Sequence, residues 1–217
     1  MVCARNEADR LPATLEALAG AFPGARVVVA DDGSTDGTSG AARAAGAELV
    51  RSERRIGKGG IATLAAERLR DDRRIRAVVL CDADLGASAA RLDRLTAVLD
   101  AGDGDLVIAR FARRAGGGFG VAVGFARRAV ARLTGLHLSA PISGQRAMLP
   151  AVLAAVLPFA PGFGMEIGMT VDAHRAGFRV VEVEVKLEHR ATGRTARGFA
   201  HRARQLADFA RTYASLR

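Results

Sequence analysis

Two aspartates one residue apart, Asp82 and Asp84, stand in the segment LCDADLGAS at residues 80–88. The apolar residues AVVL precede them and are typical of a buried strand, so two like charges stand where that strand ends. Neighbouring carboxylates repel each other unless one is protonated or a cation lies between them. Oxygen ligands of this kind suit Mg²⁺ or Mn²⁺. The segment alone leaves two interpretations open: a shared metal ion, or a strand end whose acids meet water.

A second pair of acids, Asp31 and Asp32, ends another apolar run in VVVADDGSTDGT at residues 27–38. A carboxylate at the carboxyl end of a strand can accept hydrogen bonds from a nucleobase N–H or a ribose hydroxyl. The same acids and the hydroxyls that follow them can instead cap the next helix. The spacing alone does not decide between these two interpretations.

A lysine between glycines, Lys58, stands in RRIGKGGIA at residues 54–62. Glycines let the backbone approach a ligand, and the lysine supplies a point charge. The spacing is not that of a P-loop. A basic, flexible entry into a helix explains the segment equally well.

Strand and helix patterns alternate around these residues, which predicts an α/β fold with a mostly parallel central sheet flanked by helices. The carboxyl ends of parallel strands lie at one edge of a sheet, where ligands bind. We therefore expect the acids and the lysine to meet at that edge. Strand runs lie at 26–30, 47–50, 75–81 and 105–109, and helical spacing at 8–20, 36–45, 59–70 and 89–101.

After residue 110 the sequence predicts a second half with more helix. No linker or internal repeat separates the two halves, so a single domain over residues 1–217 is the simplest interpretation. We expect helices at 120–134, 147–157 and 165–176, a strand at 178–189 in which valines alternate with charged residues, and a basic amphipathic helix at 198–216.

The composition is that of a globular chain of 217 residues, with 49% hydrophobic residues and a net charge of +9. No apolar run is long enough for a transmembrane segment and the N-terminus does not resemble a signal peptide, so we expect a cytoplasmic protein with Cys3 and Cys81 as free thiols. The positive charge favours anionic partners. One Tyr and no Trp argue against nucleic acid, since the stacking platforms for bases are missing.

Four segments together resemble the family 2 glycosyltransferases, which have the GT-A fold: ARNEADRLPATLEAL, VVVADDGSTDGT, GKG and LCDADL. The resemblance covers residues 2–110 and implies a nucleotide-sugar-binding half there, an acceptor-binding half at 111–217, and a UDP- or GDP-linked sugar donor. Asp32 would bind the base and Lys58 would lie near the phosphates or base. Asp84 would be the main metal ligand and a catalytic residue, with Asp82 near the ribose or metal. The other implied nucleotide-sugar contacts are Ala4, Arg5, Glu7 and Ala83.

The second half resembles glucosyl-3-phosphoglycerate synthases in FGMEIGMTVDAHRAG (163–177) and many family members in ISGQRAM (142–148). Those synthases use a late histidine as third metal ligand, which implies His189. Glu166, in the first of these segments, would contact the acceptor or act as a catalytic base, although the helix dipole explains a carboxylate at that position equally well. The chain also resembles polyprenyl-phosphate sugar transferases, but the mannosyltransferases among them carry Gln where this chain has Gly86, a departure from that subgroup. The implied acceptor contacts are Gly144, Arg146, Arg190 and Thr192.

These residues predict a metal-dependent transfer of a hexose from a nucleoside diphosphate sugar to a small anionic acceptor, with Mg²⁺ or Mn²⁺ as cofactor. One alternative is a polyprenyl-phosphate glycosyltransferase, attached to the inner membrane face by the helix at 198–216. Another is a nucleotide-binding domain without catalysis. A homodimer is compatible with each of them.

Overall fold

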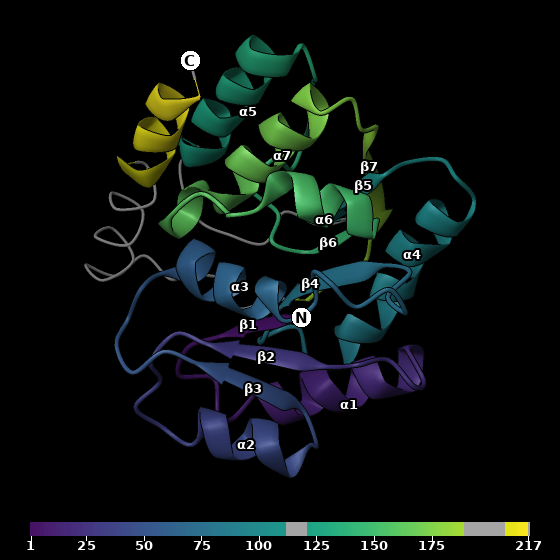
Figure 1. Ribbon diagram of the computed structural model, residues 1–217, viewed down its shortest axis with the longest axis vertical. Coiled ribbons are helices and arrows are strands. Elements are labelled where there is room, and N and C mark those ends of the chain that lie inside the picture. The colour runs from purple at the N-terminus through teal and green to yellow at the C-terminus, as the bar shows by residue number, and fades with distance from the viewer. Residues whose placement is uncertain (112–120, 189–206, 217) are drawn as a thin grey trace.

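The computed structural model describes residues 1–111, 121–188 and 207–216, and they form a seven-stranded sheet with helices on both faces. The strand order is β3-β2-β1-β4-β6-β5-β7 (Figure 1). The α/β prediction is confirmed, because all neighbouring strands run parallel except β6, which is antiparallel to both β4 and β5. The strands are β1 (Val2–Ala4), β2 (Val28–Asp31), β3 (Glu48–Arg51), β4 (Val78–Asp82), β5 (Leu106–Phe111), β6 (Arg146–Met148) and β7 (Val180–Val185).

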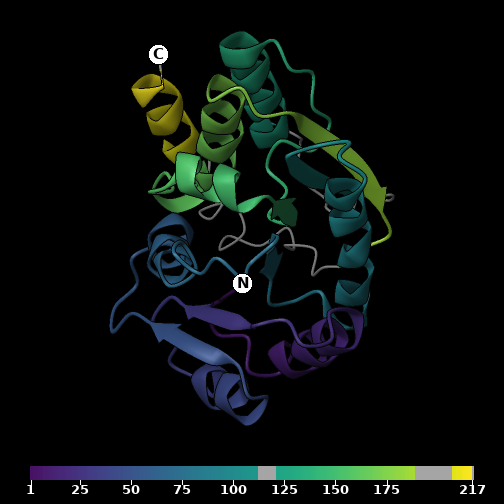
Figure 2. The same ribbon diagram turned by 45° about the vertical axis from the view of Figure 1, so that its right-hand side comes forward.

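Helices cover both faces because the strand residues alternate between two apolar clusters. In β2, Val28 and Ala30 pack toward one cluster and Val29 toward the other. The first cluster lies against α3, α6 and α7 and the second against α1, α2 and α4, on opposite sides of the sheet in Figures 1 and 2. The helices are α1 (Leu11–Ala21), α2 (Thr38–Ala44), α3 (Lys58–Glu67), α4 (Asp93–Asp100), α5 (Val121–Thr134), α6 (Pro150–Val156) and α7 (Met165–Arg175), with the 3-10 helices η1 (Gly86–Leu92) and η2 (Gly162–Gly164).

A further helix at residues 207–215 packs beside α5 and α7 in both views of the molecule (Figures 1 and 2). Its Phe209 is fully buried in a third apolar cluster with Ala126, Val130, Ile167 and Val171. No helix within the described ranges is long and apolar enough to cross a membrane.

Three sequence predictions of secondary structure are wrong in part. The strand expected at 178–189 is shorter and spans Val180–Val185. Residues 147–148, expected to begin a helix, end the short strand β6, and the helix begins at Pro150. The three residues of β6 are all buried between β4 and β5, and so short a segment has no readable periodicity. The helix expected at 89–101 divides into η1 and α4.

Strand register explains why the acidic motifs meet. The central strand β1 pairs with β2 on one side and β4 on the other, with Ala4 opposite Asp31 and Cys3 opposite Asp82. The three strands therefore end at nearly the same level. This places the segments after Ala4, Asp31 and Asp82 at one edge of the sheet.

Candidate active site

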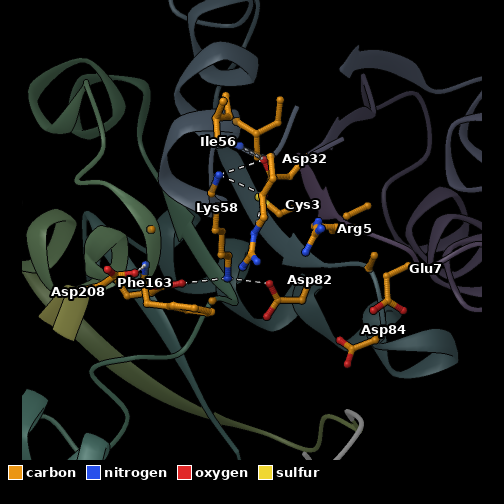
Figure 3. A pocket seen from close by; sticks show the side chains of 18 of the residues that line it. Cys3, Arg5, Glu7, Asp32, Ile56, Lys58, Asp82, Asp84, Phe163 and Asp208 are labelled. Carbon is orange, nitrogen blue, oxygen red and sulfur yellow. Dashed lines mark hydrogen bonds and ion pairs between the residues drawn. The ribbon is translucent and has the colours of Figure 1, made fainter. Parts of the chain in front are cut away.

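A cavity of about 890 Å³ opens at the carboxyl edge of β1, β2 and β4. It also receives residues from the start of α3, the turn before β6, and η2 and α7 (Figure 3). The structure brings together the following residues singled out from the sequence: Ala4, Arg5, Glu7, Asp32, Lys58, Asp82, Ala83, Asp84, Gly144 and Glu166.

Three charged side chains that line the cavity lie in contact with one another, with Lys58 between Asp82 and Glu166. We call them the charged line. The Lys58 Nζ lies 2.7 Å from Oδ1 of Asp82 and 2.9 Å from Oε1 of Glu166. Burial disfavours the charge of Lys58, but the two carboxylates outweigh that effect and hold its pKa well above the ordinary value. The lysine is therefore a fixed positive charge at the centre of the cavity.

Asp84 lies on the far side of Asp82 from Lys58, close to Glu7 in Figure 3. It lines both the main cavity and an adjoining groove between the start of α1 and η1. Asp82 and Asp84 together present carboxylate oxygens to the cavity, which is the donor type that Mg²⁺ and Mn²⁺ prefer. Over the described ranges no cluster of three or more His, Cys, Asp or Glu side chains has metal-ligand geometry. The cavity residues therefore fit a divalent ion held by two carboxylates, with further ligands from outside this pair.

The acids Asp31 and Asp32 have different environments. Asp31 is fully buried and accepts hydrogen bonds from the Ser34 backbone N–H at 2.9 Å and the Ser39 hydroxyl at 2.5 Å, so it bonds to the turn after β2 and to a side chain of α2. It does not cap that helix, whose N-cap residue is Gly37 and has no side-chain hydrogen bond. Asp32 faces the cavity, and its carboxylate also accepts backbone N–H bonds from Ile56 at 2.7 Å and Gly57 at 3.0 Å. Asp32 thereby fixes the turn that carries Lys58.

Arg146 is placed differently from the prediction. Its side chain is fully buried and is absent from the cavity lining. The guanidinium donates to the carbonyl oxygens of Ser143 and Pro141 at 2.9 and 2.8 Å and to Oγ1 of Thr170 at 2.9 Å. The expectation that Arg146 contacts an acceptor is therefore corrected: its donors bind the protein itself.

The sequence profile described as Glycosyl transferase family 2 matches residues 1–139. The chain belongs to glycosyltransferase family 2. The match ends before β6, so the family profile spans the acidic motifs and Lys58 but not Glu166.

Two curated relatives show related activities within this family. An undecaprenyl-phosphate mannosyltransferase of Micrococcus luteus is 33% identical over 203 residues, which cover 87% of this chain and 82% of the relative. A glucosyl-3-phosphoglycerate synthase of Mycolicibacterium paratuberculosis is 34% identical over 194 residues, covering 78% of this chain but only 57% of that protein. The chain thus spans little more than half the length of the second relative.

A solved structure supports the same assignment. Glucosyl-3-phosphoglycerate synthase from Mycobacterium tuberculosis, in complex with Mn²⁺, uridine diphosphate and phosphoglyceric acid, superposes with a TM-score of 0.80 at 27% identity. The superposition covers 99% of this glycosyltransferase and 76% of the synthase. This family 2 member is a nucleotide-sugar-dependent glycosyltransferase with the GT-A fold.

Three predicted residues of this glycosyltransferase, His189, Arg190 and Thr192, lie outside the described residues. The third metal ligand and two of the acceptor contacts therefore stay predictions.

The structure adds cavity residues that the sequence analysis missed, among them Arg55, Phe163 and Asp208. Arg55 stands three residues before Lys58, so its position in the same glycine-rich turn was a usable signal. Asp208 lies on the helix at 207–215, where its carboxylate accepts a hydrogen bond from the Phe163 backbone N–H at 3.2 Å. Nothing in the sequence around Asp208 indicates that contact, because it depends on how the last helix packs.

Proposed function

We propose that this glycosyltransferase moves a hexose from a nucleoside diphosphate sugar to a small anionic acceptor. The observation that carries the proposal is one cavity in which Asp84 stands beside the charged line Asp82–Lys58–Glu166. Two arginines that line the same cavity, Arg5 and Arg55, favour an acceptor with negative charge. A UDP-linked donor is favoured over a GDP-linked one, because solved relatives carry uridine diphosphate or UDP-glucose.

Asp84 and Asp82 would hold the divalent cation, as their position at the end of β4 suggests. A bound Mg²⁺ or Mn²⁺ supplies positive charge that stabilises a departing diphosphate. Lys58 adds a second positive charge that needs no reorganisation during the reaction, because the carboxylates of Asp82 and Glu166 already hold it in place. Glu166, 4% exposed, would accept a hydrogen bond from a sugar or acceptor hydroxyl.

The donor half of the proposal is tested by thermal unfolding with UDP-glucose and GDP-mannose, each with and without Mn²⁺. A ligand at 100 times its Kd stabilises the folded state by about 2.7 kcal/mol, so binding raises the midpoint by several degrees. We expect the ligand to raise the unfolding midpoint of the wild type only when Mn²⁺ is present. In Asp84→Asn we expect this Mn²⁺-dependent rise to be lost. Asp103→Asn is the matched control, since Asp103 is an exposed acid in the turn before β5. An unchanged rise in Asp84→Asn would refute the metal assignment.

The acceptor is tested by release of the nucleoside diphosphate with phosphoglyceric acid or with undecaprenyl phosphate in detergent micelles. The second acceptor is kept as the alternative because the Micrococcus luteus relative is named for it and matches most of both chains. Turnover with undecaprenyl phosphate alone would overturn the small-acceptor proposal. Donor binding without transfer to any acceptor would favour the inactive nucleotide-binding alternative. A homodimer stays a prediction from the sequence.

A further inference from the structure

The segment Gly144–Arg146 packs against Lys58 and Asp82, with Gly144 in the cavity lining and the next two residues buried behind it. Gln145 is 2% exposed and does not line the cavity. Its side-chain amide Nε2 donates to Oδ2 of Asp82 at 2.9 Å, while Lys58 Nζ contacts Oδ1 of the same carboxylate at 2.7 Å. Each oxygen of Asp82 is therefore held by a different partner.

The orientation of the Gln145 amide follows from this contact. With the amide turned over, its Oε1 would face a carboxylate oxygen at about the same distance, and two acceptors repel. Oε1 has no hydrogen-bond partner among the described residues. Among the described residues, the amide therefore bonds through its donor to Asp82 and not through its acceptor.

Gly144 makes room for the same arrangement. A Cβ at this position would lie 2.4 Å from Lys58 Nζ and 2.7 Å from Asp82 Oδ2. Contacts this short force a shift, so a larger residue would displace the end of the Lys58 or the Asp82 side chain. The absence of a side chain at Gly144 therefore leaves the space in which the ion pair lies.

Arg146 is connected through Thr170 to the backbone of Glu166, at the other end of the charged line. Its Nη1 donates to Oγ1 of Thr170 at 2.9 Å, and that hydroxyl donates to the backbone carbonyl of Glu166 at 2.8 Å. The segment is thus bonded both to Asp82 and to the first turn of the helix that carries Glu166.

We propose that Gly144, Gln145 and Arg146 form a positioning segment for the donor site, in which Gln145 holds the Asp82 carboxylate in its binding rotamer. Removing Gln145 leaves Oδ2 free to turn toward Lys58, since the ammonium is then the one cation or donor among the described residues within bonding distance of the carboxylate. The Asp82 carboxylate would then leave the orientation in which it lines the cavity in the wild type. The identity of the ligand in this inference rests on the proposed function. The hydrogen bonds of the segment do not depend on that proposal.

The first test compares Gln145→Met and Gln145→Glu with Ser143→Ala. Met keeps the length of the side chain without the donor, and Glu replaces the donor by an acceptor. Ser143 is a matched control, because it is buried in the same turn and its hydroxyl has no hydrogen-bond partner in the described part of the chain. Titration calorimetry with UDP and Mn²⁺ should show a Kd about 10-fold weaker in Gln145→Met, weaker still in Gln145→Glu, and within about twofold of wild type in Ser143→Ala. Equal affinity of Gln145→Met and wild type would overturn the proposal.

A double-mutant cycle shows whether Gln145 acts through Asp82. In the Asp82→Asn background, Gln145→Met should cause little further loss of UDP–Mn²⁺ affinity. Additive losses would show that Gln145 acts on the fold in general and would refute the positioning role.

Crystal structures of ligand-free wild type and Gln145→Met separate this inference from the proposed function. We expect the Asp82 carboxylate to change rotamer in the variant. The same rotamer in both would overturn the inference, whereas a wild type that binds no UDP with Mn²⁺ but shows the rotamer change would refute the donor proposal and leave the positioning role supported.

Discussion

Lys58 is a half-buried cation that is in contact with two carboxylates. It stands between two carboxylates, 2.7 Å from Asp82 and 2.9 Å from Glu166, and Gly144 leaves just enough space for its ammonium. Glu166 is 4% exposed, so without the lysine its charge would be buried with no ion-pair partner in the part of the chain that the structure describes. The site therefore depends on an ammonium of this size.

We expect Lys58→Met to lower the free energy of unfolding by about 3 kcal/mol, because it leaves a buried carboxylate without its partner. Turnover should fall by at least about 100-fold, since a preorganised positive charge is lost. Lys58→Arg should not restore turnover, because the planar guanidinium is larger than the space beside Gly144. The chain's other lysine, Lys186, is exposed, so Lys186→Met is the control for urea unfolding and kinetics. Normal turnover in Lys58→Met would contradict the prediction.

Cys3 lines the cavity but is expected to be a poor nucleophile. Burial raises the pKa of its thiol from an ordinary value of 9.0 to about 11, and burial also raises the pKa of Cys81. Both thiols should resist iodoacetamide at pH 8 in the folded protein and react after denaturation. Because the unfolded thiols lose protons at lower pH than the folded ones, the free energy of unfolding should decrease as pH rises from 9 toward 11. Rapid alkylation of Cys3 at pH 8 in folded protein would contradict this.

At the scale of elements, the sequence predicts the strands that carry the acids well. The runs that became β2, β4 and β5 are apolar on both faces because helices cover both sides of the sheet, and that pattern is readable without a structure. The short strand β6 is not readable, because its three residues are buried by pairing with β4 and β5, which lie far away in sequence.

The limits of prediction for the site follow from the same cause. Residue type and strand-end position bring Asp32, Asp82 and Asp84 to the cavity, but they cannot show that Asp31 bonds to the chain instead. The contacts of Gln145, Arg146 and Asp208 depend on packing between distant segments, so the sequence assigned Arg146 to the acceptor and missed the other two.

Arg146 should stabilise the packing of β6 against α7, because it lies on the strand and bonds to Thr170 on the helix. Its guanidinium makes three hydrogen bonds at 2.8–2.9 Å, and burial lowers its pKa to about 10, so it stays charged at neutral pH. We expect Arg146→Ala to lower the free energy of unfolding by about 3 kcal/mol, because several buried acceptors lose a charged donor. Arg128 on α5 is exposed, and Arg128→Ala should change stability by less than about 0.5 kcal/mol in the same urea titration. Equal effects of the two substitutions would refute a structural role for Arg146.

At the scale of the whole molecule, the net charge of +9 and the last helix bear on membrane attachment. An anchor at residues 198–216 would have to present its apolar side chains to lipid. Over the part that the structure describes, those side chains face the protein: Phe209 is fully buried, and the Tyr213 ring stacks edge-on against Phe125 at a centroid distance of 6.1 Å. Charge alone can still draw the chain to anionic lipid, but that attraction is screened by salt.

Phe209→Ala separates docking of the last helix from anchoring. A docked helix loses buried contacts, so the free energy of unfolding should fall by about 3–5 kcal/mol, while sedimentation with anionic vesicles stays as in the wild type. Leu64, 42% exposed on α3, provides the control, since Leu64→Ala should change stability little. Vesicle binding is measured at low and high salt to remove the purely electrostatic part. Unchanged stability together with weaker salt-resistant binding in Phe209→Ala would instead make this helix a membrane anchor, and with it the polyprenyl-phosphate acceptor would become the better proposal.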